Sequence, residues 1–172
     1  MNYLLHGLMV LALIVFQTAV RPQIGLLTGI YDVLIAYILF LGLYRPLKES
    51  LTVVLVSGFA MDSLSGGSFG LFLTTYFWAF TITRQLTHFL HPGNLVLRFF
   101  IVALGVVIQN GVYMGVATVL EDMTLAPASI KQTALTQLFW ALGTGFVLVT
   151  VFQQIHRKWD DILGTYFVRE AA

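Results

Sequence analysis

The chain has 172 residues, of which 58% are apolar and only 10% are charged, whereas about 25% of the residues in an average soluble domain are charged. Together with a mean hydropathy of +0.87, this composition excludes a soluble globular fold, which needs more charge to cover its surface. The net charge of +1 excludes a nucleic-acid-binding surface, and the absence of cysteine excludes disulfides and thiolate sites. The sequence therefore predicts an all-α integral membrane protein without a cofactor.

Long apolar runs bounded by charge, proline or polar clusters predict membrane-spanning helices. A hydrocarbon core of about 30 Å takes about 20 helical residues to cross, so the chain has room for five or six crossings. All four prolines lie between the runs, as expected if the runs are helices. The predicted segments cover about residues 3–20, 24–44, 50–63, 69–84, 95–120 and 134–152. Together they predict a six-helix transmembrane bundle over residues 1–152.

The third and fourth segments are short, and a polar, glycine-rich stretch over residues 62–68 separates them. The apolar run in each is below the roughly 17 residues that a crossing usually needs, so they could form one broken helix, a re-entrant pair or two tight crossings. Six crossings with a cytoplasmic N-terminus place seven Lys and Arg residues inside and two outside, whereas a single middle crossing gives six against three at best. The positive-inside rule therefore favours six crossings with both termini in the cytoplasm.

Apolar residues recur at three- and four-residue spacing from Phe152 to Phe167, with charged residues on the other faces. This periodicity predicts a cytoplasmic amphipathic tail over residues 153–172 that lies along the inner membrane surface. Trp and Tyr suit the headgroup region there, and basic residues suit anionic lipid. A plain extension of the sixth helix into the cytoplasm is the alternative.

Two acidic residues lie in the predicted apolar segments, where a charge is costly and by default marks a site. Asp62 stands beside a Ser- and Gly-rich turn, whose backbone N–H groups favour a role in fixing that turn. Asp32 lies inside the second predicted segment, where it serves either transport or a hydrogen bond between helices. Its best neutral partners are Gln109 and Asn110 in the fifth segment. Asp32, Gln109 and Asn110 are therefore a candidate intramembrane polar site.

Glycines four residues apart let helix backbones approach closely. Gly25 with Gly29 and Gly111 with Gly115 have this spacing. We expect these pairs to pack helices together, either within the bundle or against a partner helix.

The four histidines form no recognisable metal motif. His88 and His91 are three residues apart, but a proline follows at once, and His6 and His156 are isolated in the sequence. No catalytic or phosphate-binding motif occurs either. The sequence therefore predicts neither a metal site nor an enzyme.

A motif in the polar middle of the chain carries a family resemblance. Residues 58–71 read GFAMDSLSGGSFGL, after a predicted helix that ends Leu-Tyr-Arg-Pro. The motif has a glycine, an Asp-x-x-Ser-Gly turn and a further glycine, at Gly58, Asp62, Ser65, Gly66 and Gly70. In this motif, in its segment layout and in its length, the chain resembles the rod shape-determining protein MreD family. The resemblance implies a non-enzymatic inner-membrane scaffold of the bacterial elongation machinery, which supports cell shape and lateral peptidoglycan synthesis.

The resemblance also implies partners. An MreC-like bitopic membrane protein would bind the bundle and link it to the MreB cytoskeleton, to RodA and to a class B penicillin-binding protein. Membrane lipid is the further partner. The MreD family is similar in architecture to the substrate-binding subunits of energy-coupling-factor transporters. The alternative function is therefore a substrate-binding membrane subunit of a vitamin-type transporter, with Asp32, Gln109 and Asn110 around the ligand.

Overall fold

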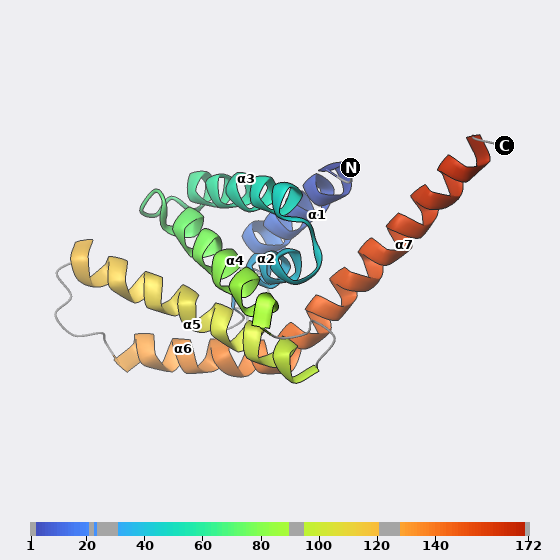
Figure 1. Cartoon of the computed structure of the whole chain (residues 1–172). Helices are drawn as coiled ribbons and strands as arrows, with labels where there is room; N and C mark the ends of the chain where they lie inside the picture. Colours follow the sequence, from blue (N-terminus) through green and yellow to red (C-terminus); the bar gives the residue numbers. More distant parts are fainter. Residues whose placement is uncertain (1–2, 21–22, 24–30, 90–94, 121–127, 171–172) are drawn as a thin grey trace.

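The computed structural model describes residues 3–20, 23, 31–89, 95–120 and 128–170, and nearly all of them are helical. Within these residues there are six continuous helical stretches (Figure 1). They are α1 (Tyr3–Val15) with the π-helical turn η1 (Phe16–Val20), α2 (Val33–Tyr44), α3 (Leu47–Ser65), α4 (Leu71–Phe89), α5 (Leu95–Leu120), and α6 (Ala128–Trp140) continued by the π-helical turn η4 (Ala141–Gly145) and α7 (Phe146–Glu170). The prediction of an all-α protein is confirmed for this part of the chain.

Three stretches are long and apolar enough to cross a membrane, by length and composition: Tyr3–Val20, Arg98–Val116 and Ala134–Asp160. Only 22% to 28% of each hydrophobic window is buried inside the protein. Most of their apolar side chains therefore face outward, which lipid allows and water does not. These helices indicate a membrane protein.

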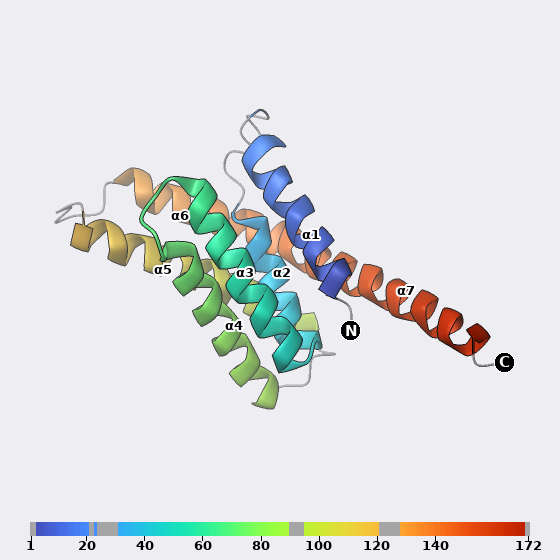
Figure 2. The same cartoon turned by 90° about the horizontal axis from the view of Figure 1, so that it is seen from above.

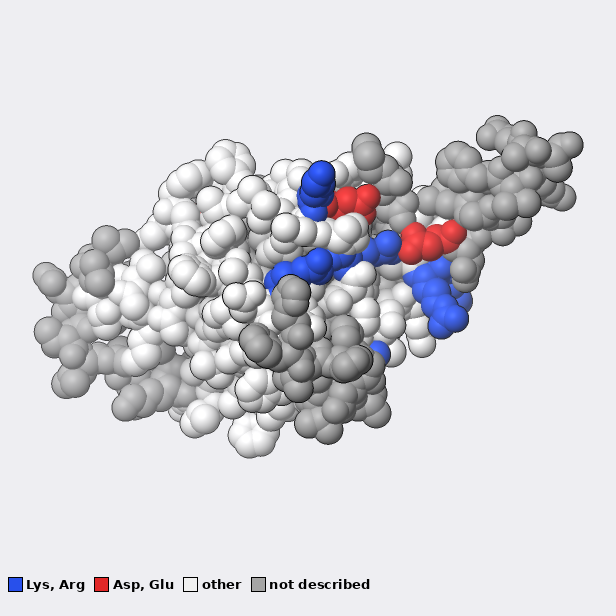
Figure 3. All heavy atoms as spheres, in the orientation of Figure 1, with Lys and Arg blue, Asp and Glu red and all other residues white. Residues whose placement is uncertain are grey.

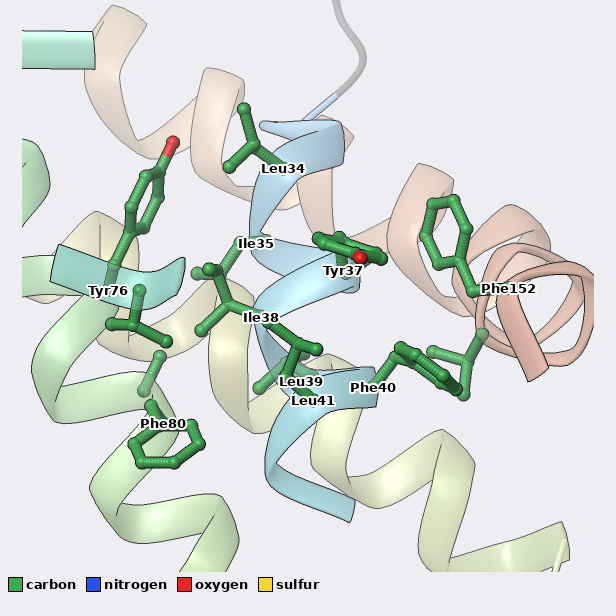
Figure 4. Packing of buried hydrophobic residues seen from close by; sticks show 14 of the residues in the cluster. Leu34, Ile35, Tyr37, Ile38, Leu39, Phe40, Leu41, Tyr76, Phe80 and Phe152 are labelled. Carbon is green, nitrogen blue, oxygen red and sulfur yellow. The ribbon is translucent and has the colours of Figure 1, made fainter. Parts of the chain in front are cut away.

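Helix α2 is the central element of the bundle. It packs against α1, α3, α4, α5 and α7, and all its residues before the terminal Tyr44 are buried. Figure 4 shows Tyr37 and Phe40 directed toward Phe152 of α7, while other side chains of α2 are directed toward α4. A helix that is apolar on every face is stable here because each face has a protein neighbour.

The other helices surround α2. Helix α1 packs on α3, α3 on α4, α4 on α5, and α5 on α6, η4 and α7. Figures 1 and 2 show α3 beside α4 and α5 beside α6, whereas the distal part of α7 extends away from the bundle. The bundle therefore encloses one short helix within a set of longer ones.

Helices α3 and α4 are longer than the apolar runs that predicted them. Each has 19 residues, because the helical backbone continues into polar residues at its ends. At about 1.5 Å per residue each spans roughly 28 Å, close to the thickness of a hydrocarbon core. They lie side by side as two helices rather than as halves of one broken helix.

Other segment boundaries also differ from the predicted ones. Helix α2 begins at Val33, and Asp32 is its N-cap rather than a residue inside it. Residues 24–30 of the predicted segment lie outside the described residues. Residues 153–170 are not a separate tail, because α6, η4 and α7 form one uninterrupted helix through residue 152 to Glu170. The physical reason is local: no proline lies between Ala128 and Glu170 to end the helix.

Charged side chains gather at one end of the bundle, where α7 leaves it (Figure 3). Arg45 forms an ion pair with Asp160 at 2.8 Å. Arg84 donates to the backbone oxygen of Arg45 at 2.8 Å, and the guanidinium of Arg98 lies over the ring of Tyr44. Basic residues from three separate parts of the chain therefore meet at one end.

Candidate functional site

All five residues of the sequence motif lie in the hairpin formed by α3 and α4. Gly66 ends α3 with a φ of 66°, and Gly70 precedes α4 with a φ of 93°, both left-handed conformations that favour glycine. The hydroxyl of Ser65 donates to the backbone oxygen of Asp62 at 3.3 Å and accepts from the backbone N–H of Gly67 at 3.4 Å. These residues together reverse the chain between the two helices.

Asp62 caps the start of α4 from the preceding helix. Its side chain is buried, and its two oxygens accept from the backbone N–H groups of Phe72 at 2.8 Å and Leu73 at 3.1 Å. These N–H groups lie in the first turn of α4 and have no partner within the helix. Gly70, which occupies the N-cap position, has no side chain to accept them. Asp62 therefore holds the turn, although its donors lie in α4 rather than in the glycine-rich stretch.

Gly58 permits the close approach that this cap requires. A Cβ atom at Gly58 would lie 2.8 Å from the Cα of Leu73, which is too close for a real contact. Leu73 is also one of the two residues whose N–H groups bind Asp62. The missing side chain at Gly58 and the cap by Asp62 are therefore parts of one arrangement.

Asp32 is buried at the start of α2. Its Oδ1 accepts from the backbone N–H of Leu34 at 2.8 Å, and its Oδ2 accepts from the hydroxyl of Tyr76 on α4. The sequence had favoured Gln109 or Asn110 as its partner. Tyr76 is 44 residues away and is one of seven tyrosines in the chain, so neither spacing nor composition singles it out.

Gln109 and Asn110 form hydrogen bonds with residues of α5 and α6. Gln109 is buried and donates to the hydroxyl of Tyr113, one turn along the same helix, at 3.2 Å. Asn110 donates to the backbone oxygen of Val106 at 2.9 Å and to Gln137 of α6 at 3.1 Å. The contacts of the three predicted polar residues are therefore directed to α4, within α5 and to α6, respectively.

The two predicted glycine pairs have different outcomes. Gly111 and Gly115 are exposed on α5, and among the described residues no atom would lie within 4 Å of a Cβ placed at either. Gly25 and Gly29 lie outside the described residues. Gly111 and Gly115 therefore leave open space on the exposed surface of α5.

A cluster that the sequence did not predict joins His6 of α1, Tyr37 of α2 and His156 of α7, hereafter the His–Tyr–His cluster. All three side chains are at most 2% exposed. His6 Nδ1 lies 2.8 Å from the Tyr37 hydroxyl and 3.2 Å from His156 Nε2, and that hydroxyl lies 3.4 Å from His156 Nε2. The two histidines are 150 residues apart, so no local pattern relates them.

Two cavities adjoin this cluster on different sides. One, of about 320 Å³, lies between α1 and α3, has His6 in its wall and is otherwise mostly apolar. The other, of about 250 Å³, has His156 in its wall together with Arg45, Arg157 and Asp160. The cluster therefore lies between an apolar space and a charged one.

Comparison of the chain with models of known protein families, with curated proteins and with solved structures gives no match. The function is therefore inferred from the chain's own residues and contacts.

Proposed function

We propose that this protein is a non-enzymatic membrane scaffold of the bacterial elongation machinery, which binds an MreC-like partner and supports cell shape and lateral peptidoglycan synthesis. The observation that carries the proposal is the α3–α4 hairpin. There, every motif residue that resembles the MreD family has a structural role, in the turn, the cap of α4 or the close contact between the helices. A motif with these roles fits a protein that acts by its shape.

The proposed topology is six crossings of the bacterial inner membrane with both termini in the cytoplasm. The gathering of Arg45, Arg84 and Arg98 at one end of the bundle supports it, because basic residues favour the cytoplasmic side. The 19-residue lengths of α3 and α4 support it too, because each is long enough for one crossing.

The proposed docking face for the partner is the outer surface of α5 around Gly111 and Gly115. Both glycines are exposed and leave open space where a side chain would be, and small residues let a second helix approach closely in lipid. The proposed occupant is the single transmembrane helix of the MreC-like protein. Through it the bundle would reach the MreB cytoskeleton, RodA and the class B penicillin-binding protein.

Co-purification from gently solubilised membranes tests this function. We expect Gly111→Leu and Gly115→Leu to reduce recovery of the partner, because a leucine on this face keeps the helices apart. Gly143→Leu is the matched control, because Gly143 is exposed and has similar open space but lies on η4. Equal recovery with all three variants would exclude this face, and a native membrane that yields no MreC-like protein would exclude the scaffold.

The alternative, a substrate-binding transporter subunit, needs polar groups that converge on one space. Neither of the two cavities described above has Asp32, Gln109 or Asn110 in its wall, which favours the scaffold. Co-purification of an ATPase pair, or thermal stabilisation of the purified protein by a vitamin, would favour the transporter instead.

A further inference from the structure

The three polar atoms of the His–Tyr–His cluster form a compact triangle with sides of 2.8, 3.2 and 3.4 Å. In a tetrahedral zinc site the ligand nitrogens and oxygens lie about 2.0–2.1 Å from the metal, which places neighbouring ligand atoms about 3.3–3.4 Å apart. The triangle is therefore close to one face of such a tetrahedron. The two histidines and the tyrosine need little movement to share one ion.

A hydrogen bond of His156 Nδ1 determines which ring nitrogen of this histidine carries the proton. Nδ1 lies 3.0 Å from the backbone oxygen of Phe152, and a carbonyl can only accept, so Nδ1 carries the proton and Nε2 presents a lone pair to the cluster. Metal-binding histidines are oriented in this way, with the second ring N–H donated to a carbonyl or carboxylate. His156 is therefore held in the tautomer that a metal ligand needs.

Hydrogen bonds alone leave the cluster incompletely paired. The buried Nε2 of His6 has no hydrogen-bond partner among the described residues, whichever ring nitrogen carries the proton. If the proton is on Nε2, two lone pairs face each other at 3.2 Å between His6 and His156. A cation at the centre of the triangle removes the repulsion between these two lone pairs, because it attracts both.

We propose that His6 Nδ1, Tyr37 Oη and His156 Nε2 bind a divalent transition metal of the zinc class. On binding, the metal replaces the phenol proton of Tyr37, which is released to solvent, and the net charge of the site rises by one. Two nitrogen ligands select zinc-like metals over magnesium and calcium. Among the described residues no three His, Cys, Asp or Glu side chains are placed to hold a metal ion, so the proposed site takes the phenolate as its third protein ligand. Water from the adjoining polar cavity takes the fourth position.

The metal would join the first and last helices to the central one. The three ligands come from α1, α2 and α7, and each belongs to a different stretch of chain. Binding by the folded protein and not by the unfolded chain raises the free energy of unfolding. The proposed metal therefore links α1 and α7 to α2. This proposal does not depend on the proposed scaffold function.

Metal titration of the full-length protein in detergent tests the proposal. The protein carries no histidine tag and is stripped with a chelator, then titrated with Zn²⁺ and, for its visible spectrum, with Co²⁺. We expect one ion per chain, the intense visible absorption of tetrahedral cobalt, and release of protons that makes binding tighter as the pH rises.

Single-residue variants identify the ligands. His6→Ala and His156→Ala should weaken binding at least about 100-fold, since loss of an outer-shell group alone costs about 10–100-fold. Tyr37→Phe should weaken binding and remove the proton released by the phenol. His88→Ala is the matched control, because it removes a histidine and leaves the three ligands in place, and it should bind like the wild type.

Tyr37→Phe also decides the case in which a histidine variant fails to fold. It keeps the ring that packs against Phe40 and Phe152, so it should retain the helical spectrum and elution volume of the wild type. Folded wild-type protein that binds no stoichiometric metal would overturn the proposal. So would unchanged affinity and proton release in Tyr37→Phe, or equal losses in His88→Ala and His156→Ala.

Discussion

The two ends of the bundle stabilise carboxylates in different ways. At one end Asp32 and Asp62 are buried and accept backbone N–H groups at the starts of α2 and α4. At the other end Asp160 is 45% exposed and pairs with the guanidinium of Arg45. A buried acid in an apolar protein therefore needs no basic partner when it can use the N–H groups and the dipole at a helix start.

Substitution of Asp62 should give the largest loss in stability. Asp62→Ala leaves two first-turn N–H groups of α4 without an acceptor, and hydrogen bonds to charged groups contribute about 1.5–3 kcal/mol each. We expect the free energy of unfolding to fall by about 3 kcal/mol, measured by denaturant unfolding in detergent. Asp62→Asn keeps one acceptor oxygen and should lose less. Equal stability of Asp62→Ala and the wild type would show that the cap is dispensable.

Tyr76→Phe should give a smaller loss, because Asp32 keeps its bond to the N–H of Leu34. The removed hydroxyl donates to a buried carboxylate, which corresponds to about 2 kcal/mol. Thermal unfolding of Tyr76→Phe and of Tyr113→Phe, the same type of substitution at another tyrosine, compares their losses of stability. A greater loss for Tyr113→Phe would contradict the role assigned to Tyr76.

Two glycine substitutions distinguish the packed hairpin from the open face of α5. Gly58→Ala places a methyl group against the backbone of Leu73, and such overpacking costs about 1–3 kcal/mol. Gly111→Ala meets open space and should be neutral or stabilising by up to about 1 kcal/mol, since alanine favours helix. Unfolding curves measured in parallel should therefore show a lower stability for Gly58→Ala, and an unchanged or higher stability for Gly111→Ala.

Loss of the ion pair at the charged end should have the smallest effect. Asp160→Ala removes the partner of Arg45, but exposed ion pairs contribute only about 0–1 kcal/mol. Added salt should reduce the small difference further, because it screens exposed charges. A loss as large as that of Asp62→Ala would show that the exposed ion pair stabilises the protein as much as the buried cap does.

Local features of the fold were predictable from the sequence. The helical class follows from composition and long apolar runs, whereas the donors to Asp62 lie 10 and 11 residues away in α4 rather than in the adjacent turn. The start of α2 was misplaced because the apolar run before Asp32 hides its character as a helix cap, although aspartate is a favoured N-cap residue.

Contacts between distant residues could not be predicted. Tyr76 meets Asp32 and His6 meets His156 only because α2 is enclosed by the other helices. A single sequence carries no signal that pairs these residues. The central position of α2 is itself a property of the assembled bundle, since its composition resembles that of any apolar helix.

The helix that runs from Ala128 to Glu170 has a mechanical consequence. Its α7 part alone has 25 residues, about 38 Å at roughly 1.5 Å per residue, which exceeds a hydrocarbon core of about 30 Å. No turn interrupts it between the bundle and its distal end (Figure 2). Because the helix is continuous, a displacement of its end near Glu170 would be transmitted along α7 to Phe152 and His156, which contact Tyr37 of the central helix.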